Sequence, residues 1–218
     1  MFTGLIRARV DLLRKSTGRR GSLVMVLARP PEWQEVRLGD SIAVHGTCLT
    51  VTALDARTMS FEATEETRAR CRFDAIHPGA ALHVERAMCL GDRLDGHLVT
   101  GHVDSLARVT EITPVEGGRR FRFSPLDDAL LPMLAPRGSV ALDGVSLTIV
   151  EADHTGFAVV LVPETLEATE LGQLQINDVV HIEVDLLARY VAHQLGFKGE
   201  GQGGGGIDLA MLKRQGLA

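Results

Sequence analysis

Residues 41–52 read SIAVHGTCLTVT, and residues 139–150 read SVALDGVSLTIV. At this offset of 98 residues, five positions carry identical residues and three more exchange one aliphatic residue for another. The largest chemical difference between the two copies is at the position of Cys48, which is equivalent to Ser146. Nearby, His45 is equivalent to Asp143. Similarity at a fixed spacing indicates a repeated structural unit. Because a thiol is softer and more acidic than a hydroxyl, the two copies are expected to differ in chemistry.

The repeat extends over most of the chain. Other motifs recur in the same order and at nearly the same offset: Glu66-Thr67 with Glu164-Thr165, 82–85 (LHVE) with 180–183 (VHIE), and, after a slip of one residue, Thr3-Gly4 with Thr100-Gly101. Ordered matches at one spacing are hard to obtain without duplication. The sequence therefore predicts a first unit at 1–97, a second unit at 98–187 and a tail at 188–218.

Each unit has the pattern of a β domain. Short segments such as SIAVHG and LTVTAL alternate apolar and polar residues, and glycine-rich turn signals recur at short intervals. Many short strands with regular turns favour an all-β barrel or sandwich. Short helical segments are expected near 64–70, 126–134 and 165–171.

The tail has a different pattern. The segment Asp185–Leu195 (DLLARYVAHQL) places Leu186, Leu187, Tyr190, Val191 and Leu195 on one stripe of a helix. Asp185 is placed to cap this helix, and Gly196 to end it. Residues 199–206 (GEGQGGGG) read as a flexible linker, and 207–217 as one more short helix. An apolar stripe outside two compact units predicts self-association.

Composition excludes several classes of protein. The formal net charge is −5, which argues against a nucleic-acid surface, and the run Arg68, Arg70, Arg72 reads as a solvated face among acidic neighbours. The three cysteines form no CxxC pair, so neither a zinc site nor a disulfide framework is indicated. No segment has the length of a signal-peptide core or a membrane span. We expect a soluble protein of a reducing cytoplasm.

Five segments carry a resemblance to a known family. They are MFTGLI (1–6), GDSIAVHGTCLTV (39–51), DGHLVTGHVD (95–104), DGVSLTIV (143–150) and VPETLEATELG (162–172). In this order, on a duplicated frame, they resemble the riboflavin synthase family of the alpha-chain type. The resemblance covers nearly the whole chain, from residue 1 into the tail.

The resemblance implies a fold and a reaction. Each half would be a six-stranded Greek-key barrel, and the C-terminal helix would hold a homotrimer. Two molecules of 6,7-dimethyl-8-ribityllumazine would dismutate by four-carbon transfer to riboflavin and 5-amino-6-ribitylamino-uracil, without cofactor or metal. The reacting pair would lie between the first barrel of one subunit and the second barrel of a neighbour. The resemblance also suggests lumazine synthase as a protein partner.

The resemblance and the duplication together nominate site residues. His102 is the expected acid–base group, since an unperturbed imidazole titrates near neutral pH. Cys48 and Ser41 would act in one lumazine site, Ser146 and Thr148 in the other, and Asp185 would supply a carboxylate. The expected substrate-binding residues are Phe2, Gly4, Leu5, Ile6, Leu49, Thr50, Glu62, Thr64, Glu66, Thr67, Gly101, Val103, Arg137, Asp143, Leu147, Val162, Pro163, Glu164 and Thr165.

Two positions depart from the pattern of the family. His45 stands where the family usually has Asn, and Arg137 stands where it usually has Lys. Arginine keeps the positive charge, but its planar fork makes a different contact from an ammonium group. If the lysine of the family donates a proton, Arg137 would weaken catalysis.

Two other functions compete with that of a riboflavin-forming enzyme. A non-catalytic lumazine or flavin carrier of the same fold would be expected to lose polar site residues in one copy, and here they are present in both. A flavin-reductase barrel domain would need a nucleotide-binding half, and the chain has no GxGxxG motif. His97 and His102 are spaced to lie on opposite faces of a strand, which argues against a shared metal. His83 and His181 read as structural or surface residues.

Overall fold

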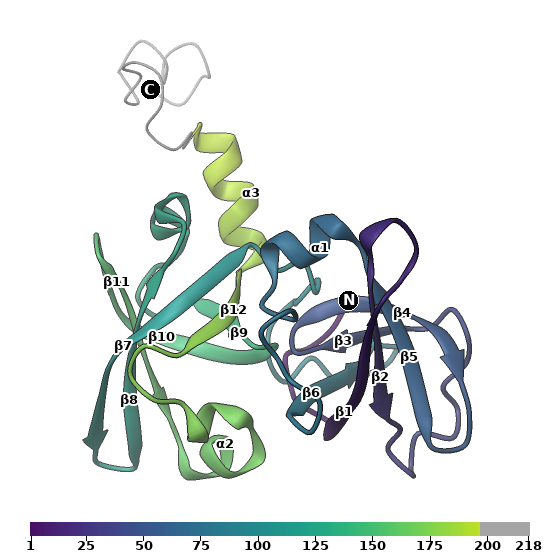
Figure 1. The fold of residues 1–218 in the computed structure, drawn as a ribbon. Coiled ribbons are helices and arrows are strands. Elements are labelled where there is room, and N and C mark those ends of the chain that lie inside the picture. Colours follow the sequence, from purple (N-terminus) through teal and green to yellow (C-terminus); the bar gives the residue numbers. More distant parts are fainter. Residues whose placement is uncertain (197–218) are drawn as a thin grey trace.

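The structure is a computed structural model that describes residues 1–196, and it consists of two closed antiparallel barrels with a helix at the end (Figure 1). The first barrel contains β1 (Ala8–Thr17), β2 (Leu23–Ala28), β3 (Ser41–Val44), β4 (Thr47–Leu54), β5 (Thr58–Ala63) and β6 (Ala81–Arg86), with η1 (Arg19–Gly21) and α1 (Glu65–Arg70). The second contains β7 (Ser105–Val115), β8 (Gly118–Pro125), β9 (Ser139–Leu142), β10 (Val145–Asp153), β11 (Gly156–Leu161) and β12 (Val179–Val184), with η2 (Asp128–Met133), α2 (Pro163–Ala168) and η3 (Glu170–Gln173). The all-β fold with two six-stranded barrels is confirmed.

The two barrels share one topology. Around the first barrel the strand order is β1-β2-β5-β4-β3-β6, and the second barrel repeats it as β7-β8-β11-β10-β9-β12. The irregularities repeat as well: the register shifts between Val51 and Ala53 in β4, and again 98 residues later between Ile149 and Glu151 in β10. Bulges bend strands and help a sheet to close. The duplication therefore preserved the backbone devices that shape each barrel.

Each barrel has its own apolar core. Phe61, Phe73 and Met25 are fully buried in the first barrel. In the second barrel, Phe123 stacks on Phe121 and on Phe157, with ring centroids 6.3 and 5.6 Å apart. Most of the phenylalanines within residues 1–196 therefore lie in these interiors.

The short helices form near the expected positions. Thr64 caps α1 by accepting a hydrogen bond from the backbone N–H of Thr67, and Pro163 begins α2, where its missing N–H costs nothing. The segment expected at 126–134 forms the 3-10 helix η2, which contains Pro132. A proline inside the segment removes a backbone donor, so a regular α-helix is disfavoured there.

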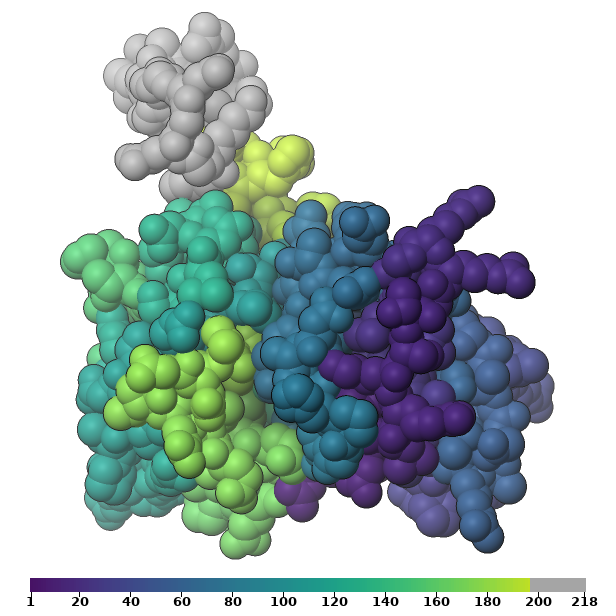
Figure 2. Space-filling model, viewed as in Figure 1, coloured from purple at the N-terminus to yellow at the C-terminus, as the bar shows by residue number. Residues whose placement is uncertain are grey.

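The C-terminal helix α3 (Leu186–Leu195) forms as predicted. Asp185 accepts a hydrogen bond from the N–H of Leu187 at 2.8 Å, and Gly196 ends the helix in a left-handed conformation with φ 70°. The helix projects away from the barrels (Figures 1 and 2). The linker predicted at 199–206 and the helix predicted at 207–217 lie outside the described residues. No helix within residues 1–196 is long and apolar enough to cross a bilayer.

The barrels meet at two equivalent hairpin turns. The β3–β4 turn contains His45 and Gly46 with φ 49° and 84°, and the β9–β10 turn contains Asp143 and Gly144 with φ 46° and 82°. Two consecutive positive φ angles are typical of the tight turns that suit twisted hairpins. A Cβ atom added to Gly46 would lie 2.6 Å from the backbone nitrogen of Gly144, so the backbones of the two turns pack directly on each other at the glycines.

A buried polar network surrounds these turns. The Asp143 carboxylate lies 2.8 Å from Nη2 of Arg72 and 3.1 Å from Nε2 of His45. Interactions with His45, Arg72 and His181 hold the pKa of Asp143 well below its usual range in spite of burial. Arg72 therefore does not belong to a solvated face, as its acidic neighbours in sequence suggested: its side chain is only 24% exposed and crosses from the first barrel to Asp143 of the second.

Two histidines extend the network with the symmetry of the repeat. His83 Nδ1 lies 2.8 Å from the carbonyl of Asp143, and its Nε2 accepts from the N–H of Glu170. His181 Nδ1 lies 2.7 Å from the carbonyl of His45, and its Nε2 accepts from the N–H of Arg72. These contacts fix one neutral tautomer for each ring. Burial lowers the pKa of His83 to about 4 and also lowers the pKa of His181, so both are structural and neither is a surface residue.

Candidate functional site

The barrels exchange short segments across their interface. The N-terminal segment leads into the first barrel, yet the carbonyl of Gly4 accepts a hydrogen bond from the N–H of Ser146 in the second barrel at 2.8 Å. In the reciprocal contact, the carbonyl of Gly101, just before the second barrel, accepts from the N–H of Cys48 in the first barrel at 2.8 Å. Each of the two divergent residues therefore lies under a segment that belongs to the other barrel.

A buried glutamate holds each crossing segment. Glu85 accepts from the N–H and the hydroxyl of Thr3 at 2.7 and 2.6 Å, and from the N–H of Gly4 at 3.0 Å. Glu183 makes the same three contacts to Thr100 and Gly101. Burial raises the pKa of both glutamates, and the hydrogen bonds oppose that shift by favouring the carboxylate. Thr-Gly and glutamate thus recur together because they form one clamp.

The glycines of the clamps allow close approach. Gly4 and Gly101 have φ 76° and 81°, a conformation that glycine adopts without penalty. A Cβ atom on Gly101 would lie 2.5 Å from Cβ of Cys48, and one on Gly4 would lie 2.6 Å from Cβ of Ser146. The segments therefore pack directly on the two strand residues, with no room for a side chain between them.

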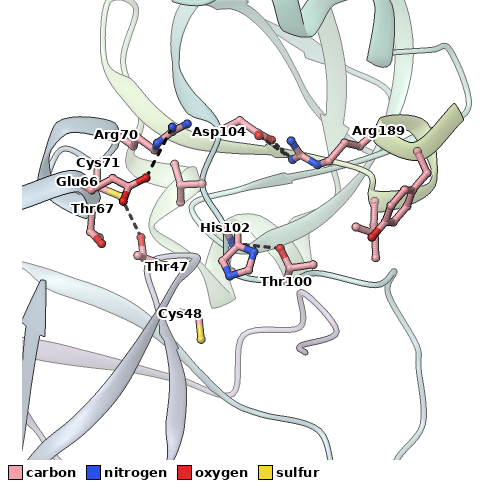
Figure 3. Close-up of a pocket in the computed structure, with 14 residues that line it drawn as sticks. Thr47, Cys48, Glu66, Thr67, Arg70, Cys71, Thr100, His102, Asp104 and Arg189 are labelled. Atoms are coloured by element: carbon pink, nitrogen blue, oxygen red, sulfur yellow. Dashed lines mark hydrogen bonds and ion pairs between the residues drawn. The ribbon is translucent and has the colours of Figure 1, made fainter. Parts of the chain in front are cut away.

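A cavity of about 520 Å³ opens beside Cys48 in the first barrel (Figure 3). Its walls come from β4, α1, the segment 100–104 and α3. Of the residues nominated from sequence, it brings together Cys48, Glu66, Thr67, Gly101, His102 and Val103. The cavity also has lining residues that sequence reasoning missed: Thr47, Arg70, Cys71, Thr100, Asp104, Leu186, Arg189 and Tyr190.

The second barrel places different chemistry beside Ser146. His97 Nδ1 lies 2.7 Å from the Ser146 hydroxyl oxygen, and His97 Nε2 is buried without a partner among the described residues. Burial lowers the pKa of His97, and the negative charge of Asp185 partly offsets the shift. Serine, histidine and carboxylate are therefore gathered at one place. Sequence reasoning considered His97 only as a metal ligand and missed this contact, which joins residues 49 apart in sequence.

Several nominated residues lie elsewhere. Leu49 and Leu147 point into the barrel cores, as expected for strand neighbours of Cys48 and Ser146, whose side chains face outward. Phe2 is fully buried between the barrels, where it packs with Ala43, Val99 and Ala141. Asp143 is 1% exposed, and its carboxylate is used by the network at the joint. The structure does not bring these four residues to a solvent-accessible site.

The remaining nominated residues lie around the two strand platforms, the outward faces of β3–β4 and β9–β10 that carry Cys48 and Ser146. Thr50 pairs with Ser41, and Thr148 pairs with Ser139, the residue equivalent to Ser41. Thr64 lies at the start of α1, and Val162, Pro163, Glu164 and Thr165 form the equivalent start of α2. Ile6 packs against the second-barrel core, and Leu5 precedes it. Glu62 accepts a hydrogen bond from the hydroxyl of Ser22, and Arg137 is exposed with φ 68°.

The site contains no arrangement typical of a metal centre. Within residues 1–196, no three His, Cys, Asp or Glu side chains are grouped so that they could hold a metal ion. The chemistry available there is that of a thiol, hydroxyls, two imidazoles and carboxylates.

Comparisons with known proteins agree with this architecture. The chain matches the lumazine binding domain family twice, over residues 3–87 and 100–185. It is 39% identical to a riboflavin synthase of Brucella abortus over 198 residues, which cover 88% of this chain and 96% of that one. It is 32% identical to a riboflavin synthase of Actinobacillus pleuropneumoniae over the full length of both chains.

Solved structures show the same fold. The structure of LumP complexed with riboflavin superposes with a TM-score of 0.76 at 20% identity, and covers 84% of this chain and 99% of that one. LumP complexed with 6,7-dimethyl-8-(1'-D-ribityl) lumazine gives a TM-score of 0.74 at 21% identity, with the same coverage. With two lumazine-binding domains and full-length similarity to those enzymes, the chain belongs to the riboflavin synthase family.

Proposed function

We propose that this chain is a riboflavin synthase that converts two molecules of 6,7-dimethyl-8-ribityllumazine into riboflavin and 5-amino-6-ribitylamino-uracil. The reaction joins two copies of one molecule in different roles, donor and acceptor. The reciprocal segment exchange supports it, because it builds two related but non-identical sites, one at Cys48 and one at Ser146. Holding two reactants in the correct orientation can contribute on the order of 7–11 kcal/mol to catalysis.

The second-barrel site supplies a base. A histidine with a lowered pKa is neutral near pH 7, so His97 can accept a proton from the Ser146 hydroxyl or from a substrate. Asp185 stabilises the imidazolium that then forms. His97 Nε2 is buried and has no hydrogen-bond partner within residues 1–196. Thr148, Thr165 and Arg137 would contact the lumazine bound there.

The first-barrel site supplies a thiol and a second imidazole. Cys48 and His102 line the same cavity, with Thr67 and Glu66 on the opposite wall (Figure 3). Here the thiol would contact the ring system, His102 would transfer a proton, and Thr67 and Glu66 would bind ring or ribityl groups. Ser41, Thr50, Glu62 and Thr64 would extend this site along the strands.

Turnover of purified protein tests the proposal. Incubation with 6,7-dimethyl-8-ribityllumazine alone should produce flavin fluorescence, and His97→Gln should lower kcat by about 10²-fold or more, the range for loss of a general base. His154→Gln, on the exposed β10–β11 turn, is the matched control and should keep full activity. Tight lumazine binding without product would instead indicate a carrier and contradict the assignment.

We further propose a homotrimer held by α3. Leu187, Tyr190, Val191 and Leu195 are 46–65% exposed on this helix, and a continuous apolar stripe of that kind is typical of an interface. The proposed reaction adds a reason, because each substrate pair would then lie between barrels of neighbouring subunits. The three cysteines are unpaired, which is in keeping with a reducing cytoplasm. From the resemblance to the family, we also propose association with lumazine synthase.

Removal of the helix tests the assembly. A chain that ends at Asp185 loses the whole stripe but keeps every strand of both barrels, so it should sediment as a monomer while the full chain sediments as a trimer. Circular dichroism of the truncated chain serves as the control for folding. A truncated chain that still sediments as a trimer would show that another surface holds the subunits together.

A further inference from the structure

A charged pair joins α3 to the segment that covers Cys48. Nη2 of Arg189 lies 2.6 Å from one Asp104 carboxylate oxygen and 2.7 Å from the other (Figure 3). The Asp104 carboxylate also accepts a hydrogen bond from the N–H of Val184, at the end of β12, at 2.9 Å. Asp104 is only 10% exposed, so this pair is stronger than an ordinary surface ion pair. The carboxylate therefore ties together a crossing segment, a strand and a helix.

The tied segment is the one that forms a wall of the first-barrel site. Between the Glu183 clamp at Gly101 and the Arg189 pair at Asp104 lie only His102 and Val103. Val103 packs into the first-barrel core, and His102 lines the cavity beside Cys48. Both ends of this short stretch are held by charged groups, so its backbone has little freedom to move away from Cys48.

Within residues 1–196, the second site has no equivalent ion pair. Arg7 occupies the position in the N-terminal segment that matches Asp104, and its backbone N–H bonds to Val84 as that of Asp104 bonds to Ile182. An arginine cannot accept the bonds that Asp104 accepts. Since α3 follows only the second copy, the first-barrel site alone has a tie of this kind, between Arg189 of the helix and Asp104 of the crossing segment. The Arg189–Asp104 pair is therefore a feature that the two repeats do not share.

We propose that Arg189 is a positioning residue for the first-barrel site: through Asp104 it fixes the His102 segment over Cys48 and couples that site to α3. The structural coupling between Arg189 and the His102 segment does not depend on the proposed function; only its expected effect on turnover does. Arg189 acts from the helix that presents the apolar stripe, so packing of that stripe against other subunits would set the segment as well. The position of the His102 segment in the first-barrel site would then depend on how the subunits pack on α3.

Amide exchange tests the coupling without reference to activity. In Arg189→Met, the peptide covering 98–105 should exchange at least about tenfold faster than in the unchanged chain, because its Asp104 end loses the ion pair and keeps only the hydrogen bonds to β12. Arg9→Met is the matched control: Arg9 forms a single 3.1 Å pair with Glu170 at 42% exposure, close to the 39% of Arg189. Exchange of 98–105 should stay unchanged in the control. Unchanged exchange in Arg189→Met would overturn the proposal.

Kinetics and a double-mutant cycle test the route through Asp104. Arg189→Met should lower kcat by about tenfold or more with a smaller change in KM, since misplacement of a reacting group by 1 Å can cost on the order of 10²-fold. Arg189→Lys, which keeps the charge, should restore part of the rate. On an Asp104→Asn background, Arg189→Met should have no further effect on exchange or rate, whereas additive effects would mean that Arg189 acts elsewhere. A chain without any turnover would refute the proposed function, and the exchange experiment would still decide the coupling.

Discussion

Asp143→Asn is expected to lower the free energy of unfolding by about 3 kcal/mol, the lower end of the range for breaking a buried ion pair. An amide keeps the shape and can still accept from the N–H of His181, which lies 2.8 Å from Asp143 Oδ1. It cannot neutralise Arg72, and its NH₂ group would face the donors of Arg72 and His45. His45 cannot adapt by changing tautomer, because its Nδ1 already accepts from the N–H of His83. The loss is tempered because Arg72 keeps 24% exposure.

Asp153→Asn provides the matched control for this measurement by urea denaturation. Asp153 also pairs with an arginine, Arg122, at 2.7 Å, but its side chain is 46% exposed. The same substitution there should cost less than about 1 kcal/mol, as for other exposed pairs. Equal losses at the two positions would show that the network between the barrels does not stabilise the fold beyond an ordinary surface contact.

Gly101→Ala is expected to lower kcat/KM by about 10²-fold or more, because it displaces the segment that covers Cys48. The new methyl group would lie 2.5 Å from Cβ of Cys48 and 2.7 Å from its backbone nitrogen. Either the segment moves, which breaks the 2.8 Å bond to Cys48 and shifts His102, or β4 moves. The left-handed φ of 81° adds strain of about 1 kcal/mol or more. Steady-state kinetics with the lumazine substrate measure the effect.

Gly79→Ala separates the clash from the strain. Gly79 has a similar φ of 92°, but no atom lies within 4 Å of the position of a new Cβ. It should therefore show a modest loss of thermal stability and nearly unchanged kinetics. If Gly79→Ala reduced kcat/KM as much as Gly101→Ala, close packing on Cys48 would not be the reason for glycine at position 101.

Much of the fold could be predicted from the sequence because the chain presents the same pattern twice. The repeated strand motif, the cap at Asp185 and the stop at Gly196 are local signals, and each appears in the structure where the sequence placed it. The role of Arg72 could not be predicted in this way. Acidic, exposed residues such as Glu66 and Asp74 lie near it in sequence, but its partner Asp143 lies 71 residues away. Only the packing of one barrel on the other brings them together.

Part of the lining of the cavity beside Cys48 could also be nominated from the sequence, for similar reasons. Cys48, His102 and Ser146 could be nominated because the copies differ or because the motifs resemble a family. The His97 contact was missed, since nothing local in DGHLVTGHVD indicates that one histidine reaches Ser146 while the other faces the cavity beside Cys48. One signal was available: the recurrence of Glu85 and Glu183 with the Thr-Gly pairs marks the two clamps, which would have placed both crossing segments.

The reciprocal crossing of the Thr3-Gly4 and Thr100-Gly101 segments points to an ancestral state. A single-barrel chain could have formed the same contacts as a symmetric dimer, in which each copy covered the strand platform of the other. Both platforms would then have been chemically identical. Fusion of the two genes removed that constraint, because a substitution could afterwards enter one platform alone. The difference between Cys48 at one site and Ser146 with His97 at the other is what such independent substitution would produce.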